Sequence, residues 1–185
     1  MISKGPLSLA GYLLPKTHMS TKQSAGILLY RLSPAEGLNP AEAPAQATRT
    51  PEVFLVHPGG PFWKNKHAGT WTIPKGEFTA DEPALDAAIR EFREETGVGL
   101  NGQFSPLNPI RQKGGKRAYA WAIAGDLDPA KLISNTFELE WPRGSGRMQA
   151  FPEVDKGAWY TLEAARAIIN PAQIPFLDEL AETLK

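Results

Sequence analysis

The chain has 185 residues, of which 42% are hydrophobic and 22% are charged, a composition typical of one globular domain. Lysine and arginine together equal aspartate and glutamate in number, so no overall field of one sign attracts nucleic acid or an anionic membrane. The absence of cysteine excludes a disulfide scaffold, a thiolate nucleophile and cysteine-ligated metal sites. We therefore expect a cytoplasmic protein, and neither nucleic acid nor a membrane as a partner.

The N-terminal part of the chain is predicted to divide at Met19. The apolar stretch at 6–15 is interrupted by glycine and proline, and it is too short to span a bilayer. The sequence after Met19 reads as the beginning of a domain. Residues 1–18 are therefore interpreted as an N-terminal extension or an expression leader, and residues 19–185 as a single domain.

The first predicted elements are two strands separated by a long insertion. Residues 24–32 and 52–58 are rich in residues that favour strands. Residues 33–51 between them are dense in proline and alanine, which is typical of a surface loop. If the two strands pair, this loop is an insertion in a hairpin and not a domain boundary.

A short strand near 70–74 is predicted to precede a helix at 81–96. Asp81 is the expected N-cap of this helix, because an acidic residue and a proline follow it in the first turn. Gly97 is the expected stop.

Strands and helices alternate in the rest of the chain. Further strands are predicted at 104–112, 116–127, 135–141 and 157–162, and further helices at 162–170 and 174–185. A sheet with interspersed helices in one domain, an α/β fold, is the expected architecture.

The helix at 81–96 carries two different faces. Its apolar stripe, at helical spacing, consists of Leu85, Ala88, Ile89 and Phe92. Three carboxylates with spacing i, i+3 and i+4 project from another patch, namely Glu91, Glu94 and Glu95. Like charges at this spacing repel one another, unless a hard dication such as Mg²⁺ or Mn²⁺ sits among them. The alternative is a solvated acidic face, which the helix dipole disfavours near a C-terminus.

The segment GEFTADEPALDAAIREFREETGV at 76–98 resembles the Nudix box, Gx5Ex7REUxEExGU with U apolar, at every fixed position. Strands before the box, and a tryptophan-bearing strand with helices after it, are also arranged as in that family. The chain is thus identified as a member of the Nudix hydrolase family. The resemblance implies an α/β/α sandwich around a mixed sheet. It also implies hydrolysis of a diphosphate linkage in a nucleoside polyphosphate, with Mg²⁺ as the cofactor or Mn²⁺ in its place.

The resemblance assigns roles within the box. The implied metal ligands are the carbonyl of Gly76 and the side chains of Glu91, Glu94 and Glu95. Glu82 and Arg90 are implied to form a structural ion pair that holds the preceding loop on the helix. A general base is needed to take a proton from the attacking water. Glu94 is the first choice within the box, and the candidates outside it are Glu140, Glu138 and Glu153.

Substrate contacts are predicted from cationic and aromatic residues outside the helix. Pro74-Lys75-Gly76 is similar to the tripeptide of diadenosine and diphosphoinositol polyphosphate hydrolases, so Lys75 is expected to contact a phosphate. The other cationic candidates are Lys64, Lys66, Lys116, Arg117, Arg143 and Arg147. The candidates for stacking on a base are Trp63, Tyr119, Trp121 and Trp141, with Trp63 preferred and Trp121 expected to be core. No relay partner is evident for His57 or His67, so both histidines are interpreted as structural.

Three functions stay open at this point. The first is hydrolysis of dinucleoside polyphosphates or (d)NTPs, and the second is hydrolysis of ADP-ribose or another sugar nucleotide. The third is a nucleotide-sensing module without catalysis, against which the complete box argues. Each has a small-molecule nucleotide as partner, and either a monomer or a homodimer is expected.

Overall fold

A computed structural model describes residues 22–33 and 49–185. The predicted leader at 1–18 lies outside the described residues, as does the predicted loop at 33–51 apart from its ends. The described strands are β1 (Gln23–Ser33), β2 (Thr50–Pro58), β3 (Lys75–Phe78), β4 (Ser105–Arg111), β5 (Arg117–Ala124), β6 (Thr136–Glu140), β7 (Met148–Pro152) and β8 (Val154–Thr161). The described α-helices are α1 (Ala84–Thr96), α2 (Leu162–Ile168) and α3 (Ile174–Thr183).

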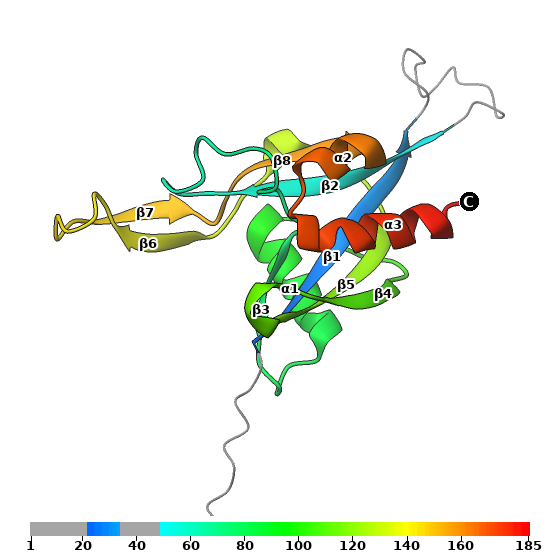
Figure 1. Cartoon of the computed structure of the whole chain (residues 1–185), viewed down its shortest axis with the longest axis horizontal. Helices are drawn as coiled ribbons and strands as arrows, with labels where there is room; N and C mark the ends of the chain where they lie inside the picture. Colours follow the sequence, from blue (N-terminus) through cyan, green and yellow to red (C-terminus); the bar gives the residue numbers. More distant parts are fainter. Residues whose placement is uncertain (1–21, 34–48) are drawn as a thin grey trace, which may run out of the picture.

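A mixed sheet forms the centre of the fold, with the strand order β4-β5-β1-β2-β8 (Figure 1). β1 runs parallel to β5 and antiparallel to β2, so the predicted pairing of the first two strands is confirmed. β3 pairs with Gln23 to Gly26 at the beginning of β1, and β2 pairs with Tyr30 to Ser33 at its end. One edge of β1 is therefore shared by two strands, with the fork between them near Ile27.

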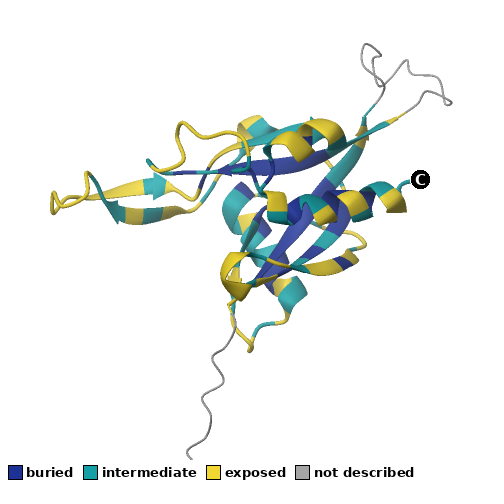
Figure 2. Ribbon diagram, in the orientation of Figure 1, coloured by how far each residue is buried: buried dark blue, intermediate teal, exposed yellow. Residues whose placement is uncertain are grey.

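Helices cover both faces of the sheet. Along β1, Ala25, Ile27 and Leu29 are buried against the cluster that contains Phe92 of α1. Leu28 points to the opposite face and joins the cluster that includes side chains of α2 and α3. Figure 2 shows the buried residues concentrated in the sheet strands between these helices. The predicted α/β fold with an α/β/α sandwich is confirmed.

The helix α1 begins later than predicted, so the prediction of Asp81 as N-cap is wrong. The backbone N–H of Glu82 donates to the carbonyl of Thr79 (3.2 Å), which uses these residues in a turn. Pro83 is extended (φ −59°, ψ 133°) and stands at the N-cap position. The predicted stop is confirmed, because Gly97 is left-handed (φ 75°) and its N–H donates to the carbonyl of Arg93.

Two strand predictions need correction. The strand expected near 70–74 is reduced to isolated bridges at Trp71 and Thr72, and the regular strand β3 begins at Lys75. β7 was not predicted, and it pairs with β6 to form a separate two-stranded antiparallel sheet. This β6–β7 ribbon (residues 136–152) projects from the sandwich in Figure 1.

The described ranges 22–33 and 49–185 contain no helix that is both long and apolar enough to cross a membrane.

Candidate active site

β3 and α1 meet where Gly76 faces Glu91. A Cβ atom on Gly76 would overlap the carboxylate of Glu91, so only glycine lets this side chain lie against the strand. The position of Gly76 is set by the register of β3 on β1, where it pairs with Ala25. The buried Phe92 and Ala88 fix α1 on the same sheet. The local packing therefore brings one carboxylate of the helix to the backbone of the strand.

Glu95 lies on the same side of α1 and is held by β3. Its Oε2 accepts a hydrogen bond from the backbone N–H of Lys75 (3.0 Å). Burial raises the pKa of Glu95 to about 8, although the nearby Lys75 ammonium acts in the opposite direction. Burial also raises the pKa of Glu91, and the Arg90 guanidinium acts against this shift. A cation with oxygen affinity would relieve the cost of burying both charges.

Arg90 organises the outer part of the same helix. Its Nε and Nη2 donate to the two carboxylate oxygens of Glu82 (2.9 and 3.0 Å), which forms the expected ion pair with the preceding loop. These hydrogen bonds are the main reason why the pKa of Arg90 is raised. Its Nη1 donates to Glu91 (2.7 Å) and to Glu94 (3.1 Å). One guanidinium thus compensates three carboxylates.

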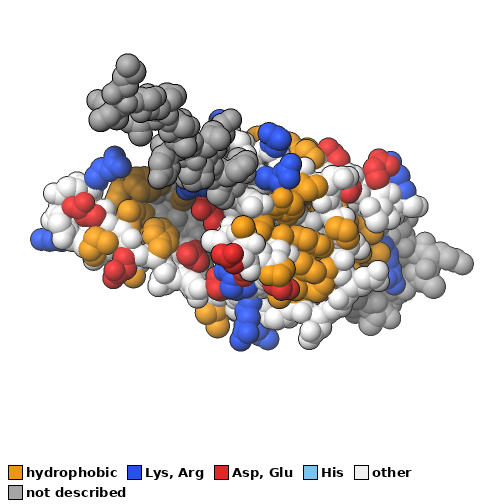
Figure 3. Space-filling model, turned by 90° about the horizontal axis from the view of Figure 1, so that it is seen from below, with side chains coloured by type: hydrophobic (Ala, Val, Ile, Leu, Met, Phe, Trp, Pro, Cys, Tyr) orange, Lys and Arg blue, Asp and Glu red, His pale blue; other side chains and the backbone are white. Residues whose placement is uncertain are grey.

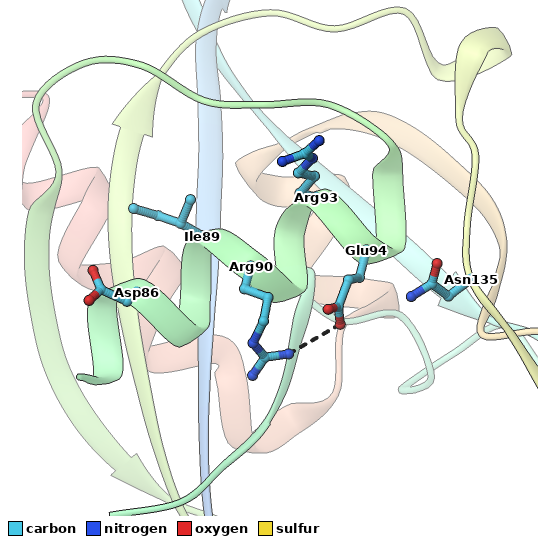
Figure 4. A pocket seen from close by; sticks show the side chains of 6 residues that line it. All are labelled: Asp86, Ile89, Arg90, Arg93, Glu94 and Asn135. Atoms are coloured by element: carbon cyan, nitrogen blue, oxygen red, sulfur yellow. Dashed lines mark hydrogen bonds and ion pairs between the residues drawn. The ribbon is translucent and has the colours of Figure 1, made fainter. Parts of the chain in front are cut away.

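Glu94 lies further out than the other two glutamates. Its side chain is 36% exposed, compared with 13% for Glu91. Figure 4 shows it between Arg90 and Asn135, at a cavity of about 520 Å³ on the outer face of α1. The carboxylates of the predicted patch therefore differ in exposure to solvent: Glu95 is half-buried beside Lys75, and Glu94 is open.

The oxygen donors at this place fit a hard dication in their chemistry, because carboxylate and carbonyl oxygens are the ligands that Mg²⁺ and Mn²⁺ favour. The overlap that a side chain at Gly76 would cause shows that the strand leaves room for a carboxylate here. In the arrangement described for 22–33 and 49–185, no three acidic, histidine or cysteine side chains converge as a ready metal cage. Arg90 binds Glu91 and Glu94 in this arrangement.

The three candidate bases outside the box lie in different places. The charge of Glu153, at the junction of β7 and β8, raises the pKa of both Glu91 and Glu95. Glu140 lies at the outer end of β6, where its carboxylate accepts a hydrogen bond from the Gly146 N–H (2.6 Å). Glu138 lies on the same ribbon, opposite Ala150. Of these three, Glu153 is the one whose charge adds to the effect of burial on the pKa of the α1 carboxylates.

Comparison with known proteins decides the family. A model of the NUDIX domain matches residues 46–180, which is most of the chain. The chain belongs to the NUDIX family. The prediction of a Nudix pyrophosphohydrolase that acts on phosphoric anhydrides is confirmed at this level.

Solved structures of Nudix proteins share the fold. An Ap4A hydrolase from C. elegans in a binary complex is 22% identical, with a TM-score of 0.52 over 88% of this chain and 97% of that chain. A mutT/nudix family protein from Listeria innocua is 16% identical (TM-score 0.54; 88% and 93% covered). The NUDIX domain of Shewanella oneidensis NrtR, complexed with ADP ribose, is 15% identical (TM-score 0.56; 94% and 95% covered). At these identities the likeness concerns the fold alone.

In this Nudix domain the predicted substrate contacts fall into separate groups. Lys116 lies close to Lys75, because its charge contributes to lowering the pKa of Lys75 after the larger effect of burial. Lys116 also forms an ion pair with Glu77 (2.8 Å). Tyr119 packs edge-on against Phe78 of β3, with ring centroids 5.9 Å apart. These residues lie at the end of the sheet that carries Gly76.

The second group lies on the loop at 59–69. Trp63 is exposed, and the Lys66 ammonium lies 4.9 Å from the centroid of its ring. Lys64 lines a cavity of about 540 Å³ between this loop and the β6–β7 ribbon. Arg143 is exposed in the turn at the tip of the ribbon, between β6 and β7. Trp121 is half-buried against the α1 side of the core, as expected.

Sequence reasoning missed the surroundings of His57. This histidine is only 2% exposed, and its Nδ1 lies 2.7 Å from Oδ1 of Asp155. Its Nε2 lies 2.7 Å from the carbonyl oxygen of Lys66. These contacts are compatible with the structural role expected for His57, although the sequence did not indicate Asp155 as its partner. Asp155 is 98 residues away in the sequence, and only the pairing of β2 with β8 brings the two together.

Figure 3 shows charged side chains of both signs near the centre of one face, beside a broad area of hydrophobic side chains.

Proposed function

We propose that this Nudix domain hydrolyses a diphosphate linkage in a nucleoside polyphosphate, with Mg²⁺ as the cofactor. The observation that carries the proposal is the packing of Glu91 and Glu95 against β3, with the Lys75 ammonium beside them. Buried carboxylates next to a cation suit a site where a dication and an anionic phosphate chain bind together.

The metal would be held by Glu91, Glu94, Glu95 and the carbonyl of Gly76. When bound, a dication supplies charge neutralisation at phosphate oxygens and activates water. The chain's own contribution is to position these oxygens. The N–H of Lys75 orients the carboxylate of Glu95, and the glycine at position 76 lets Glu91 approach the strand.

Glu153 is the proposed general base. Its charge acts on Glu91 and Glu95, so its carboxylate is near the reacting centre, whereas Glu140 is engaged at the ribbon tip. A carboxylate in this place can take a proton from the attacking water as the bond to phosphorus forms. Glu94, the first choice from the sequence, is instead placed between Arg90 and Asn135 and is assigned to the metal.

Lys75 and Lys116 are proposed to bind the phosphate chain. Burial lowers the pKa of Lys75, and the charge of Lys116 acts in the same direction; an anionic phosphate between the two lysines would relieve this repulsion. Two adjacent cations favour a substrate with several phosphates over one with a single anhydride. Together with the Pro74-Lys75-Gly76 tripeptide, this supports dinucleoside polyphosphates or (d)NTPs as substrates.

The decisive experiment is a substrate panel with full-length protein and Mg²⁺. The panel contains ATP, dNTPs, dinucleoside polyphosphates and ADP-ribose, and the products are separated by chromatography. We expect the highest kcat/KM for a substrate with three or more phosphates. A clear preference for ADP-ribose would move the function to the sugar-nucleotide class, and no turnover by folded protein would contradict hydrolysis.

Glu95→Gln tests the site within the same panel. Because it removes a charged ligand while keeping the shape, kcat is expected to fall by about 100-fold or more. Glu182→Gln is a matched control, since Glu182 is an exposed residue on α3 that pairs only with the neighbouring Lys185 among the described residues. Equal activity of both variants would remove Glu95 from the site.

A further inference from the structure

The cavity of about 540 Å³ between the 59–69 loop and the β6–β7 ribbon, here called the ribbon cleft, has no role in the chemistry described above. It is large enough for a nucleoside, since pockets for small molecules span about 300–1,000 Å³. Its lining combines aromatic rings with side-chain amides and charges, and the residues used below are Trp141, Phe151, Gln149, Asn65, Lys64 and Asp155.

The aromatic wall of the ribbon cleft is fixed by contacts outside it. The ring of Trp141 is packed edge-on by Phe62, with centroids 5.5 Å apart and planes at 86°. Phe151 is packed in turn by Phe137 across the ribbon (6.2 Å). These contacts restrict the orientation of the two rings that line the cleft.

Amide groups stand beside these rings. Gln149 Nε2 donates to the carbonyl oxygen of Trp141 (3.1 Å), which fixes the side chain next to the indole. A glutamine amide has a second N–H and an acceptor oxygen, and Asn65 supplies a further amide from the loop. Planar rings flanked by donors and acceptors match the chemistry of a nucleobase, which has a stacking face and a polar edge.

His57 connects the two walls of the cleft through hydrogen bonds. Its Nδ1 bonds to Asp155, which lines the cleft from β8, and its Nε2 bonds to the carbonyl of Lys66 on the loop. Both ring nitrogens thus have a polar partner, and the side chain is almost fully buried. A buried hydrogen-bonded bridge between two surface segments holds them in place, which indicates that the cleft has a fixed shape.

The loop also touches the ribbon directly. A Cβ on Gly59 would overlap the carbonyl oxygen of Pro152, and the Gly59 N–H donates to the carbonyl of Glu153 (2.8 Å). Pro152 lines the cleft, and the next residue is the proposed general base. One lining residue of the ribbon cleft is therefore the sequence neighbour of the proposed general base.

We propose that the ribbon cleft binds the nucleoside of the substrate, with the base stacked on Trp141 and its polar edge hydrogen-bonded by Gln149, Asn65 and Asp155. The inference rests on the proposed function, because it assigns the non-phosphate part of the same substrate. Lys64, which also lines the cleft, is assigned to the phosphate next to the nucleoside. His57 is a positioning residue for both walls.

The test separates the base from the phosphates. KM is measured for the best nucleotide of the panel, and inorganic tripolyphosphate, which has no base, serves as a competitive inhibitor that reports on the phosphate half. For Trp141→Ala we expect KM to rise about tenfold or more, as for the loss of one stacked base. The Ki of tripolyphosphate is expected to stay within about twofold.

Three further variants distinguish loss of the nucleoside contact from a general change in structure. Gln149→Leu, on an exposed position, is expected to raise KM without changing the Ki of tripolyphosphate. Met148→Ala, the neighbouring exposed residue that does not line the cleft, is expected to change neither. For His57→Gln we expect KM to rise with kcat retained, a split that a general loss of stability does not produce.

The outcomes distinguish this inference from the proposed function. Turnover with unchanged KM in both Trp141→Ala and Gln149→Leu overturns the nucleoside site and leaves hydrolysis intact. Parallel increases in KM and in the Ki of tripolyphosphate also overturn it. Binding of adenosine 5′-monophosphate, measured by calorimetry, needs no turnover: its loss in Trp141→Ala supports the site even if the panel shows no hydrolysis.

Discussion

The α1 carboxylate face and the ribbon cleft are built in opposite ways. The first is contained in 23 consecutive residues, 76–98, where one strand and one helix pack on a shared sheet. The second is assembled from the 59–69 loop, the β6–β7 ribbon and the beginning of β8, which are separated by about half the chain. Local sequence can therefore specify the residues that carry out the reaction, whereas tertiary structure specifies which substrate reaches them.

The largest expected effect is at the strand side of the carboxylate face. Gly76→Ala places a methyl group where the Glu91 carboxylate lies, so this side chain must leave its position. We expect kcat to fall by about 100-fold or more, with a measurable loss of stability. Steady-state kinetics and thermal unfolding check both.

Gly99→Ala is the matched control for this variant. A Cβ at Gly99 meets no atom within 4 Å, and its backbone is not left-handed, so activity and stability should stay close to wild type. If Gly76→Ala behaves like this control, the close approach of strand and helix has no catalytic meaning.

Glu153→Gln and Glu140→Gln compare the two regions directly. The first variant removes the proposed base near Glu91 and Glu95, and kcat is expected to fall by about 100-fold, as is usual for a general base. The second removes an acceptor at the ribbon tip and should change kcat by less than about threefold. A larger loss of kcat in Glu140→Gln than in Glu153→Gln would indicate that Glu140, on the ribbon, is the general base.

The carboxylate face also predicts a pH dependence for metal-free protein. The pKa of Glu95 is raised from 4.5 to about 8 by burial, so the folded chain binds more protons than the unfolded chain between these values. Stability should therefore fall as pH rises from about 5 to 8, by about 2–5 kcal/mol at most. Thermal unfolding in EDTA measures this slope.

Two additions sharpen the pH experiment. Glu95→Gln should flatten the slope, because the neutral amide does not titrate. Excess Mg²⁺ should raise the Tm more at pH 8 than at pH 6, because a deprotonated carboxylate binds the ion more tightly. A Tm without pH dependence in wild-type protein would show that Glu95 titrates normally.

The smallest expected effect belongs to Trp63, on the 59–69 loop but not among the residues that line the ribbon cleft. Trp63 is exposed and stacks with the Lys66 ammonium, so it contributes to the surface more than to a pocket. For Trp63→Ala we expect an increase in KM of less than about fivefold with kcat unchanged. A loss in kcat in Trp63→Ala as large as that in Gly76→Ala would show that Trp63 and the α1 carboxylate face belong to one site.

Much of the fold was predictable because apolar periodicity and breakers are local signals. The strands around β1 and β5 and the stop at Gly97 follow from such signals. The start of α1 was not predictable, because a turn at Thr79 to Glu82 competes with the capping position. β7 has the sequence MQAFP, without a β-branched residue, and is a strand only through its pairing with β6.

The candidate site likewise has a part that the sequence predicts and a part that it does not. The proximity of Gly76, Glu91 and Glu95 follows from the box, and so does the ion pair of Glu82 with Arg90. No spacing in the sequence indicates that Glu153 lies closer to the carboxylates than Glu140 does, because both flank the same ribbon. That distinction arises from the direction in which the ribbon leaves the sandwich (Figure 1).

The pairing of both β3 and β2 with one edge of β1 has a consequence for the dynamics of the protein. β1 is hydrogen-bonded by β5 on one side and by β3 and β2 in turn on the other, so few of its amide hydrogens are open to solvent. In hydrogen–deuterium exchange, β1 should be among the last segments to exchange. Because Gly76 is registered on this strand, the end of the molecule where a metal is proposed to bind would stay rigid during turnover. Any closure around a substrate would then be carried by the loop and the ribbon.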